Sequence, residues 1–94
     1  MILSQYINTA GKAVKNHFIV RNKNDKIGNY VLFQSYDTIV AVYLIDYSKL
    51  IVNSHKYSNT TSKHKNDFIK YMNYKDILKL TEIEFQNYIK NWIE

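Results

Sequence analysis

The sequence predicts a single α+β domain over residues 1–94. It is expected to hold an antiparallel four-stranded meander sheet, with a short N-terminal helix and two C-terminal helices packed on one face. Three observations support this prediction. Short apolar runs rich in β-branched and aromatic residues gather in the first half of the chain. The connections between them are too short for parallel crossovers. Helical patterns occupy the second half, and such segregation of strands and helices is typical of α+β domains.

Residues 3–10 are expected to form the N-terminal helix. Apolar side chains recur there at i, i+4 and i+7, the spacing of one helical face: Leu3, Ile7 and Ala10. Ser4 is placed to cap the first turn. Gly11 follows where a left-handed residue commonly ends a helix.

Four segments are expected to form the strands: residues 17–20, 30–34, 38–45 and 50–53. The third segment is apolar at every position after Thr38 and rich in β-branched residues. A strand without polar alternation is covered on both faces, so this one is expected at the centre of the sheet.

Two helices are expected in the second half, over residues 60–73 and 82–93. The first carries the apolar stripe Phe68, Ile69 and Met72. The second opens with a capping box between Thr81 and Glu84, whose side chains and backbones satisfy each other's hydrogen bonds. Its apolar stripe is Phe85, Ile89 and Trp92.

Helices on one face alone would leave the other side of the central strand open to water. A second copy of the chain is one way to cover that side. A homodimer is therefore among the expected assemblies.

The composition narrows the class of protein. There is no cysteine, which excludes disulfides and cysteine–zinc sites. No apolar run approaches the roughly 18 to 20 residues that span a bilayer, and the first residues lack the pattern of a signal peptide. A cytoplasmic protein without membrane contact is therefore expected.

Asn, Ile, Lys and Tyr supply 44 of the 94 residues, and their A/T-rich codons indicate a low-GC bacterium, its phage or plasmid, or an archaeal virus.

The net charge of +5 is unevenly spread. Residues 1–24 carry +4 and residues 47–75 carry +5, whereas the other segments are acidic overall. Two interpretations stay open. The basic blocks, with Arg21 and Lys23 in the first, could meet as one face that binds nucleic acid. They could equally be a solvated lysine-rich surface. The single arginine argues against base-specific recognition, for which arginine is preferred.

The candidate site is the polar stretch where the strand-like half ends and the helical half begins. It contains hydroxyl, aromatic and cationic or titratable side chains and no acid: Tyr57, Ser58, Thr60, Thr61, Ser62, Lys63, His64 and Lys65. Ser58, Thr60 or Thr61 is needed to cap the helix that follows. The other side chains could bind an anion, nucleic acid or a partner, or the stretch could be purely structural. It is not a P-loop, because it contains no glycine.

No catalytic, metal or cofactor site is predicted. His17, His55 and His64 lack the spacing of known metal motifs and are expected at the surface or in caps. Ser62 and His64 are close in sequence, but that proximity is not catalytic geometry. A non-enzymatic protein is therefore expected. The tyrosines in or beside the expected sheet suit base stacking, half-buried positions in strands or a protein interface.

Residues 57–64 are Tyr-Ser-Asn-Thr-Thr-Ser-Lys-His, and residues 36–41 are Tyr-Asp-Thr-Ile-Val-Ala. These segments resemble the Y-S-x-T-T-S-K-H signature and the Y-x-T-x-I-A segment of a family of small, mostly phage-encoded proteins of unassigned function. Val40 is the departure from the second pattern. The resemblance implies a phage or mobile-element origin and supplies no catalytic residues.

Two functions from different classes are expected. The first is a non-enzymatic phage or mobile-element accessory protein that binds and inhibits a host nucleoprotein defence machine, such as a CRISPR effector, in the host cytoplasm. The alternative is a general DNA- or RNA-binding protein in phage replication or transcription, whose binding weakens steeply with salt. The expected partners are thus a host protein or nucleoprotein complex, or nucleic acid directly.

Overall fold

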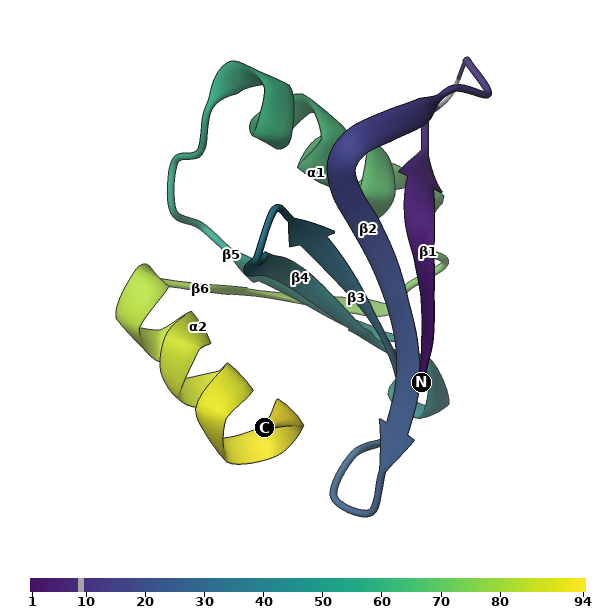
Figure 1. Ribbon diagram of the computed structural model, residues 1–94. Coiled ribbons are helices and arrows are strands. Elements are labelled where there is room, and N and C mark those ends of the chain that lie inside the picture. Colours follow the sequence, from purple (N-terminus) through teal and green to yellow (C-terminus); the bar gives the residue numbers. More distant parts are fainter. Residues whose placement is uncertain (9) are drawn as a thin grey trace.

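The protein is built around one six-stranded sheet, seen in a computed structural model that describes residues 1–8 and 10–94 (Figure 1). The strands are β1 (Ile2–Ile7), β2 (Ala13–Asn24), β3 (Gly28–Ser35), β4 (Thr38–Leu44), β5 (Lys49–Asn53) and β6 (Asp76–Leu80). The α-helices are α1 (Asn59–Tyr71) and α2 (Glu82–Tyr88). A 3-10 turn, η1 (Ile45–Tyr47), links β4 to β5, and a π-helix, η2 (Ile89–Ile93), continues α2.

The strands lie in sequence order across the sheet. The first five pair antiparallel, whereas β6 runs parallel to β5 and is reached through α1. A parallel neighbour needs such a crossover. The predicted antiparallel four-stranded meander, with a short N-terminal helix and all helices on one face, is therefore wrong: the sheet is mixed, has six strands, and includes most residues of the expected N-terminal helix.

The segment predicted as the N-terminal helix forms β1 instead. Its apolar spacing matched a helix, but Ile2 pairs with Arg21 and Gln5 pairs with Phe18 on β2. Tyr6 is its buried residue, and its ring packs edge-on against Phe33 at 5.2 Å between centroids. Residue 9 of the predicted helix lies outside the described residues.

Strand β6 was missed because its sequence, Asp-Ile-Leu-Lys-Leu, is short and has no regular alternation. Its pairing with β5 decides its conformation, with Leu50 opposite Ile77 and Val52 opposite Lys79. The edge of β5 has free backbone donors and acceptors that need partners, and β6 supplies them.

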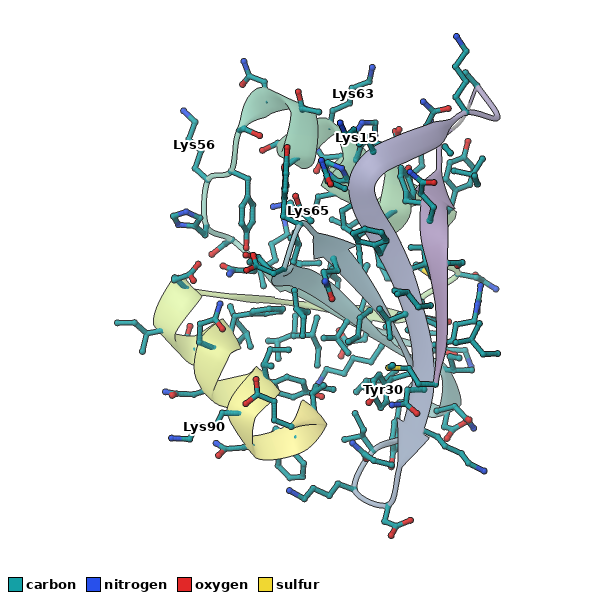
Figure 2. The ribbon with its side chains drawn as sticks, in the orientation of Figure 1. Lys15, Tyr30, Lys56, Lys63, Lys65 and Lys90 are labelled. Carbon is teal, nitrogen blue, oxygen red and sulfur yellow. The ribbon has the colours of Figure 1, made fainter. Side chains whose placement is uncertain are left out.

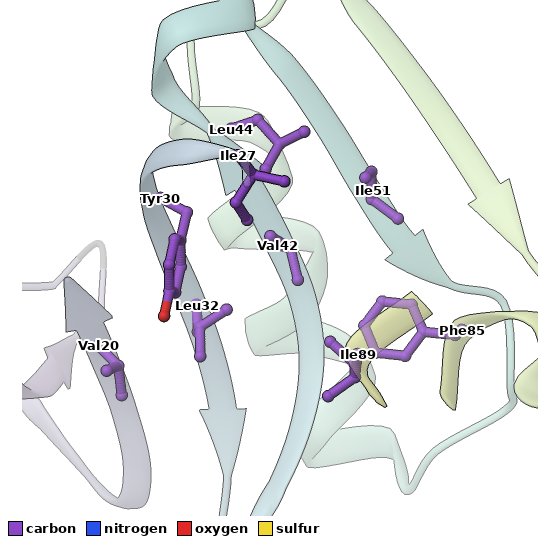
Figure 3. Packing of buried hydrophobic residues seen from close by; sticks show 9 residues of the cluster. All are labelled: Val20, Ile27, Tyr30, Leu32, Val42, Leu44, Ile51, Phe85 and Ile89. Carbon is purple, nitrogen blue, oxygen red and sulfur yellow. The ribbon is translucent and has the colours of Figure 1, made fainter. Parts of the chain in front are cut away.

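The two helices cover opposite faces of the sheet, since alternate residues of β3 and β5 enter different buried clusters. One cluster lies between the sheet and the segment formed by α2 and η2. It contains Val20, Ile27, Tyr30, Leu32, Val42, Leu44, Ile51, Phe85 and Ile89 (Figure 3). The other cluster, called the cluster under α1, lies between the sheet and α1. It contains Tyr6, Val31, Phe33, Val40, Ala41, Leu50, Val52 and Phe68. The face that was expected to need a second copy of the chain is thus covered by α2.

A β-bulge in β4 adjusts the sheet to these two layers. Phe33 pairs with Ala41 but Gln34 pairs with Ile39, so Val40 is an extra residue opposite β3. Val40 and Ala41 consequently both join the cluster under α1.

Strand β2 bends sharply near its start, as Figure 1 shows. The pairing with β1 shifts between Phe18 and Ala13, and Asn16 adopts a left-handed φ of 63°. The Asn16 carbonyl accepts a hydrogen bond from the Tyr36 backbone N–H at 2.6 Å, which ties the bend to the β3–β4 turn. This bend carries His17 to the start of α1.

The C-terminal helix confirms the predicted capping box: Thr81 and Glu84 exchange side-chain and backbone hydrogen bonds. The predicted inward position of Trp92 is wrong, because Trp92 is 44% exposed. The wider π-helical turn places Ile93 against the core instead. Among the described residues, no helix has the length and apolar character needed to cross a membrane.

Candidate functional site

The candidate stretch forms the entrance to α1. Ser58 is the N-cap, and its Oγ accepts a hydrogen bond from the Thr61 backbone N–H at 3.3 Å, which confirms the expected capping role. The Ser62 hydroxyl donates to the Tyr57 carbonyl at 3.4 Å. The first turn of α1 contains no acidic residue, and Thr60 is exposed.

Thr61 points into the protein and joins α1 to two strands. Its hydroxyl lies 3.1 Å from Ser35 Oγ and 3.5 Å from His17 Nε2, and Ser35 Oγ lies 3.3 Å from the same nitrogen. His17 Nδ1 lies 2.9 Å from the Lys15 carbonyl. A carbonyl oxygen only accepts, so His17 Nδ1 donates in this hydrogen bond.

His64 lies beside this cluster, with its ring 5.2 Å from that of His17 and 5.5 Å from that of Tyr6. Its buried Nδ1 has no hydrogen-bond partner among the described residues. Burial, followed by the nearby His17, lowers the pKa of His64. The predicted surface or capping role is wrong for both histidines, since His17 is 3% and His64 is 7% exposed.

Lys65 turns inward to β5 rather than outward to solvent. Its Nζ donates to the Asn53 carbonyl at 3.2 Å and lies 5.6 Å from the centre of the Tyr57 ring. Burial lowers the pKa of Lys65, and it raises the pKa of Tyr57 to about 12. These two candidate residues therefore hold the loop before α1 in place.

Asn53 connects this loop to α2. The side chain is fully buried, and its Nδ2 donates to Glu82 Oε2 at 2.8 Å while its Oδ1 accepts from the His55 N–H at 2.9 Å. The Asn53 hydrogen bond is the main reason that the pKa of Glu82 is lowered. His55 is exposed and lies 3.7 Å from Glu82.

Three exposed lysines form the outward-facing part of the site. Lys15, Lys56 and Lys63 are exposed and lie at the same end of the molecule, with Lys90 at the other (Figure 2). The contact of His17 with Thr61 brings Lys15 to this end, although it is far from Lys63 in sequence. We call these three lysines the basic end.

Arg21 and Lys23 do not join the basic end. Both are exposed on the later part of β2, where Arg21 pairs with Ile2 and Val31. Arg21 lines a hollow with Tyr71 and Met72, which belong to the opposite end of α1. The predicted site residues thus occupy two separate surfaces.

Sequence reasoning missed four residues that build the site, namely Tyr6, His17, Ser35 and Asn53. One signal could have found the inward side of α1: Thr61, His64 and Phe68 follow the i, i+3, i+7 spacing of one helical face. Nothing in the sequence could have joined that face to His17 or Ser35, because the contacts depend on the bend in β2.

The side chains of the histidine and hydroxyl cluster are buried. Ser35 and His17 stand as a nucleophile and base would, but both are almost completely buried, so a substrate has no access to them. Within residues 1–8 and 10–94, no three His, Cys, Asp or Glu side chains are grouped to hold a metal ion. The exposed groups at the entrance to α1 include the charged side chains of Lys56 and Lys63 and the hydroxyl of Thr60.

Comparison with known families matches residues 1–87 to a family of unknown function, DUF8033. Neither the curated proteins nor the solved structures gave a match. Since the matched segment includes the whole sheet, α1 and nearly all of α2, the chain belongs to the DUF8033 family.

Proposed function

We propose that the protein acts by binding rather than by catalysis, and that its basic end contacts the phosphate backbone of nucleic acid in a nucleoprotein complex. The observation that carries this proposal is that lysines from both basic blocks of the sequence lie at the same end of the molecule. Lys15 comes from the first block, whereas Lys56 and Lys63 come from the second, and they share one end of the fold (Figure 2).

The local electrostatics support an anionic partner. The first turn of α1 has no acid, and the positive end of its dipole adds to the charge of Lys63. Lysine suits phosphate as a point charge, whereas base reading favours arginine. Because Arg21 lies elsewhere, the proposed contact is with the backbone and is independent of base sequence.

The biological role that we propose is that of a phage or mobile-element accessory protein that inhibits a host nucleoprotein defence complex, of which a CRISPR effector is one example. Exposed lysines can contact the phosphates of such a complex, which supports inhibition by binding. The basic end also favours a second candidate, a general DNA- or RNA-binding protein.

Charge reversal tests the basic end. The double variant Lys15→Glu/Lys63→Glu is expected to bind a fluorescein-labelled duplex DNA of arbitrary sequence at least about tenfold more weakly in about 50 mM salt. The slope of log K against log salt should become shallower by about two, since roughly one counterion is released per lost phosphate contact. Fluorescence anisotropy measures both quantities.

The matched control is Lys75→Glu/Lys90→Glu, which changes the net charge equally at exposed positions outside the basic end. It should keep most of the affinity and the original salt slope. Equal losses in both double variants would mean that net charge alone drives binding. No binding by the unaltered protein at low salt would remove nucleic-acid contact from the proposal.

Affinity purification separates the two candidate roles. The tagged protein is exposed to lysate of a low-GC bacterium that carries CRISPR effectors, with and without nuclease. A protein complex that stays bound after nuclease treatment supports the inhibitor. Recovery of nucleic acid alone, lost on nuclease treatment, supports the general binder.

A further inference from the structure

Strand β1 is one edge of the sheet, and the register of its pairing with β2 shifts between Gln5 and Ile7. Within residues 1–8 and 10–94 it pairs with β2 alone, and Ile2, Leu3 and Ile7 are 64%, 59% and 55% exposed. Edge strands are normally protected by charges, proline or bulges. β1 contains no charged residue, whereas β6, the other edge, contains Asp76 and Lys79. The two edges of the sheet are therefore not equivalent.

A hollow of about 290 Å³ lies along β1 on the side of α1. Four successive residues of the strand, Ser4 to Ile7, line it. Ile19, Val31 and Phe68 belong to the buried cluster under α1 or pack against it, so the hollow lies beside β1 on the α1 face of the sheet. The rest of its lining is mainly apolar: Ile19, Val31, Phe68, Tyr71, Met72 and the side chain of Arg21.

Arg21 is the only arginine in the chain, and it has no carboxylate partner. The one ion pair among the described residues joins His55 to Glu82. Arg21 also lines a second hollow of about 390 Å³ together with Met1, Ile2 and Lys23. Neither hollow has an acidic residue in its lining. A ligand that follows β1 thus meets unpaired positive charge beside apolar surface.

We propose that β1 binds an extended segment of a partner protein by strand addition. The backbone of the segment pairs with the free edge of β1, an apolar side chain enters the 290 Å³ hollow, and an acidic side chain pairs with Arg21. This is a protein-binding surface separate from the basic end, and it goes beyond the proposed contact with nucleic acid.

The charges favour this occupant over the alternatives. A second copy of the chain would bring two Arg21 side chains and two chains of net charge +5 together, without an acid on either β1. Nucleic acid would satisfy Arg21 but would leave the apolar hollow unfilled. An acidic, partly apolar peptide satisfies both.

The test uses fluorescein-labelled, end-blocked peptides of about eight residues, in which valine and threonine alternate and one glutamate occupies each position in turn. A matched set has lysine in place of glutamate. The glutamate set is expected to bind the unaltered protein and to lose at least about tenfold in affinity on Arg21→Glu. The lysine set should prefer Arg21→Glu. Lys75→Glu is the control and should bind as the unaltered protein does.

Amide hydrogen exchange locates the peptide independently of charge. Binding of a glutamate peptide should slow exchange within residues 2–7. The proposal is overturned if no peptide slows exchange there, or if Arg21→Glu binds the glutamate set undiminished. It is also overturned if sedimentation shows that a dimer of this chain already covers the edge, or if duplex DNA rather than peptide protects these amides.

Discussion

The fold opposes protonation of His64, mainly through burial. This histidine lies between the rings of Tyr6 and His17 in the contact between α1 and the sheet. A proton on His64 would place a charge in a buried site beside a second imidazole. Its lowered pKa therefore links the stability of the α1 layer to pH.

The free energy of unfolding should fall as the pH is lowered below about 6.5, the ordinary histidine pKa. In that range the unfolded chain binds a proton at position 64 that the folded chain excludes. The stabilisation is complete above the unfolded pKa and is lost as the pH falls through the folded one. Urea denaturation between about pH 7.5 and pH 5.5 measures it.

His64→Gln should reduce this pH dependence, because the side chain no longer titrates. His55→Gln is the matched control, since His55 is exposed and belongs to the loop before α1. An unchanged pH slope in His64→Gln would show that another group is responsible.

The side chains of the candidate stretch differ in the direction in which α1 orients them: some face the sheet and others face solvent. Ser58 was predictable as a cap, because the hydrogen bond to Thr61 spans three residues. The burial of Thr61 and His64 was not predicted, because it depends on His17 and Ser35 from distant strands. Lys63 is exposed, whereas Lys65 turns inward and donates to the carbonyl of Asn53.

The C-terminal helical segment is held by Phe85 and Ile89 rather than by Trp92. Phe85 is fully buried between α2 and the sheet (Figure 3). Trp92 lies on the outer side of η2, although its backbone carbonyl accepts from Asn24 Nδ2 at 2.8 Å. The carbonyl of Asn91 accepts from Lys26 Nζ at 2.9 Å, so the β2–β3 turn caps this end of the segment.

Phe85→Ala should destabilise the protein by roughly 3 to 5 kcal/mol, because it leaves a cavity in the core. Trp92→Ala should cost less than about half of that, since much of the ring is already in water. Chemical denaturation measures both changes. Equal losses of stability would mean that the π-helical turn does not direct Trp92 away from the core.

At the level of the whole molecule, Asn53 ties together the two layers on opposite faces of the sheet. Its side chain binds Glu82 at the start of α2, and its carbonyl accepts from Lys65 of α1. The loop before α1 is fastened to the same side chain through the His55 N–H. A buried polar group with all of these partners is costly to remove.

Asn53→Ala should destabilise the protein by roughly 1 to 3 kcal/mol, because it leaves the His55 N–H without its acceptor. The pKa of Glu82 should rise toward its usual value, since the Asn53 amide no longer stabilises the carboxylate. Denaturation and NMR titration of Glu82 measure the two effects. Asn87→Ala, at an exposed position of α2, is the control and should change stability by less than about 0.5 kcal/mol.

Local patterns were enough to place the middle strands, both C-terminal helices and their caps. The segments predicted at residues 30–34, 38–45 and 50–53 lie in β3, β4 and β5, apart from Ile45, because turns and apolar runs act over a few residues. Tertiary pairing decided the edges and the layers. Residues 3–7 became β1 through β2, and Asp76–Leu80 became β6 through β5, so backbone partners distant in sequence overrode the local pattern. The placement of α1 and α2 on opposite faces depends on the β5–α1–β6 crossover. No local hydrogen bond specifies the parallel pairing of β5 with β6, because the two strands are far apart in sequence.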